Sequence, residues 1–174
     1  MLALAAFDSQ QAIAGCMFQM VSHGLLTGAL FLLVGVLYDR AHTREIAAFG
    51  GLGSKLPVYT AFMSFFAFGS LGLPGISGFV SEVMIFLGSF AVLNKVLVGI
   101  AVLGVVLGAA YILRMVQRVF LGDFDLARWG KLTDMNFREL VTVVPLAVLA
   151  LWIGVYPKPL ADLMNATLSN LIVL

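Results

Sequence analysis

Charge is scarce in this sequence of 174 residues, of which only 11% are Asp, Glu, Lys or Arg. A soluble globular domain has about 25% charged residues, so this chain has too few to cover a surface that faces water. Its ten basic residues are balanced by nine acidic ones and form no basic stripe. The scarcity of charge therefore excludes a soluble enzyme and leaves no support for nucleic acid as a partner.

Residues that bind metals and nucleotides are also scarce. The single cysteine, Cys16, and the two histidines, His23 and His42, have no metal-ligand spacing. The sequence contains no GxxxxGKS, no GxGxxG after a strand, and no CxxC or CxxCH. We therefore expect no catalytic redox centre, cofactor or metal ion in this chain.

Apolar residues, in contrast, make up 61% of the chain and form long runs. The sequence lacks the alternation of a β-barrel, so helices must satisfy the backbone hydrogen bonds in lipid. We predict an all-α, multi-pass integral membrane protein, a bundle of about four to five transmembrane helices in one membrane region. The predicted segments are the end of a truncated span at 1–7, transmembrane helices at 11–38, 96–120 and 141–156, a broken transmembrane helix at 57–92, and a C-terminal tail at 157–174.

The run at 57–92 is too long for one ordinary span. As a continuous helix it would measure about 52 Å, against about 30 Å of hydrocarbon. Its middle, 69–78, is rich in glycine and contains a proline. The helix-breaking residues are Gly72, Pro74, Gly75 and Gly78. This segment is either a turn between two short spans or an unwound break within a single span.

The distribution of basic residues favours a single crossing. In that arrangement the loops at 39–56 and 119–138 share one side, and the other side has only Lys95 and Lys158. The shared side contains Arg40, Arg44, Lys55, Arg128, Lys131 and Arg138. A hairpin would nearly balance the two sides, so the positive-inside rule predicts one broken crossing, two cytoplasmic loops and a tail outside.

Glu82 is the ionisable residue that fits neither a loop nor a span end, because it follows the predicted break near mid-depth. An Asp at a helix centre costs about 2.5–3.5 kcal/mol on insertion scales, so such a carboxylate must be protonated, paired or hydrated. Each of these states suits a proton carrier, and the alternative is a protonated Glu that only joins helices. His23 also lies near mid-depth, where an imidazole can either relay protons or join two helices.

Other polar and small residues near these positions have less specific interpretations. Hydroxyl groups that could hold water come from Ser22, Ser64, Ser70, Ser77 and Ser81. The pairs Gly24/Gly28 and Gly104/Gly108 either allow close helix packing or reflect the high frequency of glycine in membrane helices. Arg114 and Arg118, near the cytoplasmic end of a span, are interpreted as interfacial anchors or partners of Asp123 and Asp125.

Several motifs in chain order resemble one family. Ser22-His23-Gly24 leads into 28–35, and then 37–46 reads Leu-Tyr-Asp-Arg-Ala-His-Thr-Arg-Glu-Ile. Gly50-Gly51-Leu52 and the segment 71–82 follow, and the likeness extends to Tyr156-Pro157. These motifs resemble the C-terminal part of the antiporter-like subunit M (chain 4) of proton-pumping NADH:quinone oxidoreductase, respiratory complex I.

The resemblance implies the last third of a fourteen-helix fold of inverted repeats, with the N-terminal part of the same subunit absent. It implies a proton-translocating subunit without a redox centre, which couples quinone reduction to pumping through Glu82 and His23. NAD, FMN, iron–sulfur clusters and quinone would belong to other subunits. The implied partners are the neighbouring antiporter-like subunits, and the implied location is the bacterial inner membrane. Alternatively, the chain belongs to a multisubunit cation/proton antiporter or a membrane-bound hydrogenase complex.

Overall fold

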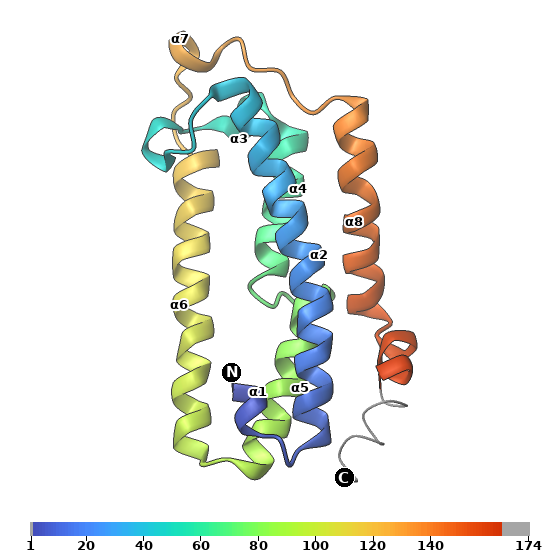
Figure 1. Ribbon diagram of the computed structural model, residues 1–174. Helices are drawn as coiled ribbons and strands as arrows, with labels where there is room; N and C mark the ends of the chain where they lie inside the picture. Colours follow the sequence, from blue (N-terminus) through green and yellow to red (C-terminus); the bar gives the residue numbers. More distant parts are fainter. Residues whose placement is uncertain (1, 165–174) are drawn as a thin grey trace.

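The computed structural model describes residues 2–164, which form a bundle of long helices joined at their ends by short segments (Figure 1). The predicted all-α class is confirmed. The elements are α1 (Leu2–Ala5), α2 (Gln10–Ala41), the 3₁₀ turn η1 (Ile46–Ala48), α3 (Leu52–Lys55), α4 (Pro57–Gly69), α5 (Ser77–Val92), α6 (Lys95–Phe120), α7 (Leu126–Trp129) and α8 (Phe137–Val155).

The three longest helices of the described part, α2, α6 and α8, are each long and apolar enough to cross a membrane. α2 has 32 residues, which is about 48 Å of helix. The Ser9 side chain caps its start by accepting a hydrogen bond from the backbone N–H of Ala12, at 3.3 Å. It ends where His42 takes a left-handed backbone conformation, with φ of 52°.

α4 and α5 are too short to cross separately, with 13 and 16 residues. Figure 1 shows α5 continuing downward from the lower end of α4, without folding back beside it. The predicted broken helix is therefore present, with residues 70–76 between its two arms.

The ends of the other elements differ somewhat from the ranges expected from sequence. The segment expected at 11–38 is helical from 10 to 41, and the one expected at 141–156 is helical from 137 to 155. A capping box starts α8, since Asn136 and Glu139 each accept a hydrogen bond from the other's backbone N–H. Of the predicted tail at 157–174, residues 165–174 lie outside the described part.

The segments 42–56 and 121–136 lie together at one end of the bundle, the upper end in Figure 1. The backbone N–H of Gly51 donates to the Leu121 carbonyl at 3.0 Å, and the Trp129 indole donates to the Ala48 carbonyl at 2.9 Å. At the same end, Arg40 of α2 forms an ion pair of 2.8 Å with Glu139 of α8. If the broken helix crosses the membrane once, the segments before and after it and α6 must lie at the same end of the bundle, as these two segments do.

The main core lies between α2 and α4, below these joined segments. Leu33 and Phe66 are fully buried there, together with Tyr59, whose hydroxyl donates to the Leu33 carbonyl at 3.1 Å. α6 contributes less, since only Val98, Val119 and Phe120 of its described residues are buried. Most of the surface of α6 is therefore free to meet lipid, water or further helices.

Candidate functional site

The break between α4 and α5 is a defined turn. Gly72 and Gly75 have φ of +74° and +91°, in the left-handed region that glycine enters without a steric penalty. The N–H of Gly72 donates to the Gly69 carbonyl at 3.2 Å, and that of Leu73 donates to the Phe68 carbonyl at 3.1 Å. These bonds close the end of α4, while exposed Pro74 lies at the outer part of the turn.

Two buried serines attach the start of α5 to α2. The Ser77 and Ser22 hydroxyls hydrogen-bond each other at 2.8 Å, and both residues are almost completely buried. One turn further along α5, the Ser81 hydroxyl contacts the Gln19 side-chain carbonyl and the Gly78 carbonyl. These contacts align α5 against one face of α2.

Small residues let other backbones approach the break closely. A Cβ at Gly78 would collide with the carbonyl of Gly69, across the break. A Cβ at Gly154 of α8 would collide with the backbone of Gly75 and Ile76. The break is therefore enclosed by α8 as well as by α2, in keeping with the rule that irregular backbone at membrane depth is buried in protein or lines water.

The Glu82 carboxylate turns back from the second turn of α5 toward the break. A Cβ at Gly72 would collide with its oxygen Oε2, so the carboxylate lies directly against that glycine. Among the described residues, Glu82 takes part in neither ion pair, since these join Arg40 to Glu139 and Lys158 to Asp162. The carboxylate is therefore available to bind water.

A cavity of about 270 Å³ lies beside Glu82, between the break and α6. Its polar groups are Ser70, Glu82 and Tyr111, and the α6 wall includes the small residues Ala101, Gly104 and Gly108. A water needs polar partners and only a small volume, so this cavity has room for several. The Ser70 hydroxyl also donates to the Phe66 carbonyl at 3.0 Å.

His23 does not line this cavity. It is exposed on α2, where its Nδ1 lies 3.2 Å from the Thr27 hydroxyl, while the adjacent Ser22 faces α5. The structure thus places His23 at the level of the break but does not bring its imidazole to the Glu82 carboxylate. Ser64 is half-buried on α4 and does not line the Glu82 cavity.

The predicted glycine pairs do not pack against other helices within the described part of the chain. A Cβ at Gly24, Gly28 or Gly104 would meet no atom within 4 Å, and one at Gly108 would meet only the Tyr111 ring, at 3.9 Å. Gly104 and Gly108 instead border the Glu82 cavity. Close packing occurs at glycines that the spacing did not indicate, such as Gly78 and Gly154.

The charged side chains at the end of α6 are exposed. Neither Arg114 nor Arg118 forms an ion pair with a described carboxylate, Asp123 and Asp125 included. The two arginines flank a shallow pocket at the end of the helix. Of their two predicted interpretations, the interfacial anchor is the one that fits this placement.

No metal centre is formed by the residues that the structure describes. No group of three or more His, Cys, Asp and Glu side chains within residues 2–164 could hold a metal ion. Cys16, His23 and His42 lie at separate positions along and after α2.

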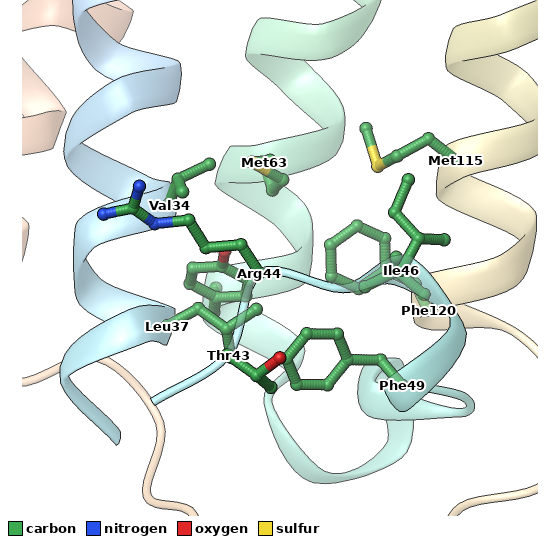
Figure 2. Close-up of a pocket in the computed structure, with 11 residues that line it drawn as sticks. Val34, Leu37, Thr43, Arg44, Ile46, Phe49, Met63, Met115 and Phe120 are labelled. Atoms are coloured by element: carbon green, nitrogen blue, oxygen red, sulfur yellow. The ribbon is translucent and has the colours of Figure 1, made fainter. Parts of the chain in front are cut away.

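A second cavity, of about 240 Å³, lies where α2, α4 and α6 meet the 42–49 segment (Figure 2). Its walls are largely apolar and include Met63, Met115 and Phe120. Figure 2 shows the Arg44 side chain crossing this region, and its guanidinium lies 4.5 Å from the Tyr38 ring centroid. Arg44, Thr43 and Tyr59 are the polar residues of its lining.

Two residues at the site were not predicted from the sequence. Gln19 precedes Ser22 by three positions, and Tyr111 follows Gly108 by three. Residues three apart share a helix face, so this spacing could have placed Gln19 beside the serines and Tyr111 beside the glycines. No sequence pattern indicated which face of α6 meets Glu82.

Comparison with known proteins places these features in a family. A model of the family described as "NADH:quinone oxidoreductase/Mrp antiporter, TM" matches residues 1–108. NADH-quinone oxidoreductase subunit M of Rhodobacter capsulatus is 44% identical over 94% of this chain and 32% of that protein. NADH-ubiquinone oxidoreductase chain 4 of Arabidopsis thaliana is 42% identical over 93% of this chain and 32% of that protein. The chain spans about a third of the length of these relatives.

Solved structures agree with the sequence comparison. A chain of respiratory complex I from Thermus thermophilus with bound NADH matches with a TM-score of 0.81 and 29% identity, over 96% of this chain and 37% of that one. A chain of the archaeal membrane-bound sulfane sulfur reductase matches with a TM-score of 0.77 and 26% identity, over 83% of this chain and 24% of that one. The predicted antiporter-like fold and the resemblance to subunit M are confirmed. The chain belongs to the NADH:quinone oxidoreductase/Mrp antiporter family of transmembrane proteins.

Proposed function

We propose that this chain is part of a proton-translocating membrane subunit of NADH:quinone oxidoreductase, in which Glu82 carries a proton. The observation that carries the proposal is the Glu82 carboxylate beside the break, without an ion-pair partner among the described residues and open to a cavity. A carboxylate at this depth is unfavourable unless it is protonated, paired or hydrated. A group that changes between the first and last of these states moves a proton.

His23 is proposed as the second proton-binding group. Its imidazole does not reach Glu82, but the chain neighbours Ser22 of His23 and Ser81 of Glu82 both form polar contacts between α2 and α5. Ser22, next to His23, bonds Ser77, and Gln19 contacts Ser81, next to Glu82. With water, these hydroxyl and amide groups supply a route for protons from the imidazole to the carboxylate.

Energy for this transfer must come from outside the chain. Moving one charge across 100 mV takes about 2.3 kcal/mol, and we assign the NAD, FMN, iron–sulfur clusters and quinone that release energy to other subunits. The partners are then the neighbouring antiporter-like subunits and the remainder of this subunit. Because most basic residues lie near the joined 42–56 and 121–136 segments, we propose from the positive-inside rule that this end faces the cytoplasm of a bacterium and that the tail lies outside its inner membrane.

The decisive experiment is Glu82→Gln in the full-length subunit within its assembled complex. The amide keeps the shape but cannot release a proton, so we expect at least a several-fold loss of proton translocation coupled to quinone reduction. Asp162→Asn is the matched control, because Asp162 is exposed and pairs only with Lys158. An unchanged proton-to-electron ratio and rate in Glu82→Gln would overturn the proposal.

A second candidate is a subunit of a multisubunit cation/proton antiporter or of a related membrane-bound reductase or hydrogenase complex. It is favoured by the Mrp antiporters within the matched family and by the likeness to a chain of the sulfane sulfur reductase. Neighbouring genes distinguish the two candidates. Genes for flavin, iron–sulfur and quinone-module subunits beside this one support the first.

A further inference from the structure

We propose that Tyr111 of α6 is the partner through which Glu82 exchanges its proton with the water in their shared cavity. This inference rests on the proposed function of Glu82. It assigns a role to a residue on a helix that the proposal above does not use.

The cavity brings the two proton-binding groups together from different helices. Glu82 comes from α5 and Tyr111 from α6, and both line the same space of about 270 Å³. They are the titratable side chains of its lining; its third polar side chain, Ser70, already donates its hydroxyl hydrogen to the Phe66 carbonyl. Tyr111 is therefore the second titratable residue of the lining, and its hydroxyl forms no side-chain hydrogen bond with the described residues.

Gly108 leaves room for the ring of Tyr111. Side chains on a helix tilt toward its N-terminus, so a ring at position 111 lies over the turn that contains position 108. A Cβ at Gly108 would lie 3.9 Å from the Tyr111 ring and would meet no other atom within 4 Å. The ring therefore lies over a position with no side chain, on the face of α6 that borders Glu82.

Gly104 keeps the rest of the cavity open. A Cβ there would meet no atom within 4 Å, so packing against another described helix does not require glycine at this position. Together with Ala101 it leaves room between α6 and the Glu82 carboxylate. A larger side chain at position 104 would fill the space in which water would lie.

The Tyr111 phenol is neutral both before and after the proton transfer. A protonated water donates a proton to the Tyr111 oxygen as the hydroxyl's own proton leaves to the Glu82 carboxylate, which leaves a neutral water, a neutral phenol and a protonated carboxyl group. The reverse sequence carries a proton away from the Glu82 carboxyl group. Tyr111 is 67% exposed, so the residues that the structure describes do not enclose its side chain, and a bridging water could reach its hydroxyl.

The test compares Tyr111→Phe with Tyr111→His in the assembled complex. The phenylalanine keeps the ring and loses the hydroxyl, whereas the histidine changes the ring and keeps a group that binds and releases protons. We expect Tyr111→Phe to lower the rate of proton translocation at least three-fold and Tyr111→His to recover part of it. A packing role predicts the opposite order, and that result would overturn the inference.

Tyr156→Phe is the matched control, because Tyr156 is an exposed tyrosine outside the cavity. Gly104→Leu should also lower translocation, whereas Gly99→Leu should not, because position 99 is equally uncrowded but does not line the cavity. Loss in Glu82→Gln with full activity in both Tyr111→Phe and Gly104→Leu would refute this inference and leave the proposed function standing. Full activity in Glu82→Gln would refute both.

Discussion

At the scale of single residues, Asp134 shows how a loop residue stabilises a distant helix. Its carboxylate accepts hydrogen bonds from the backbone N–H groups of Val58, at 2.8 Å, and Tyr59, at 3.0 Å. These are N–H groups in the first turn of α4, and the residue before that helix, Leu56, provides no side-chain cap. Asp134 thus replaces the usual capping residue from a segment far away in the sequence.

Asp134→Ala should weaken the start of α4. The loss of a capping side chain costs about 0.5–2 kcal/mol, so we expect a lower melting temperature for the purified, detergent-solubilised complex. Asp123→Ala is the control, since Asp123 is exposed and forms neither of the described ion pairs. Equal melting temperatures for the two variants would contradict the capping role.

At the scale of elements, the break depends on glycines that have different tasks. Gly72 has a left-handed backbone and leaves space for the Glu82 carboxylate. Gly78 allows the backbone of α5 to approach that of Gly69, and Gly154 allows α8 to approach the backbone of the break. The carboxylate therefore lies against a turn whose backbone geometry requires glycine.

Gly72→Ala should displace the Glu82 carboxylate. A left-handed backbone costs a residue with a Cβ about 1–2 kcal/mol, and this Cβ would collide with the carboxylate. We expect reduced proton translocation in the assembled complex. Gly24→Ala, at a helical position with no atom within 4 Å, should retain the parental rate, and equal rates for both variants would contradict this account.

The sequence predicted where the helices begin and end better than which side of each helix faces its neighbours. Glycine and proline at 69–78 predicted the break, and the distribution of basic residues favoured one crossing over a hairpin. The Asn136/Glu139 capping box was also readable and would have placed the start of α8 correctly. The direction of Glu82 toward α6 could not be predicted, because it depends on how seven irregular residues, 70–76, rotate α5 after α4.

At the scale of the whole molecule, the charges divide the bundle into two ends. Of the ten basic residues, Lys95 and Lys158 belong to one end and the other eight to the end with the joined segments. Such an imbalance orients a bundle in its membrane, because segments rich in Lys and Arg are retained on the cytoplasmic side.

Single-cysteine variants test this orientation. In a cysteine-free background, Lys55→Cys should react with a membrane-impermeant maleimide in inside-out vesicles, and Lys95→Cys in right-side-out vesicles. Both residues are exposed and lie at opposite ends of the bundle. Labelling of both variants from the same side would contradict the single broken crossing.

The contact of Gly154 with the break has a consequence for how such sequences can change over time. Any larger residue at position 154 would collide with the backbone of Gly75 and Ile76. A mutation there would survive only with a compensating shift of the turn, so α8 and the turn cannot diverge independently. Substitutions in these two distant segments should therefore occur together. We expect positions 75 and 154 to covary among relatives.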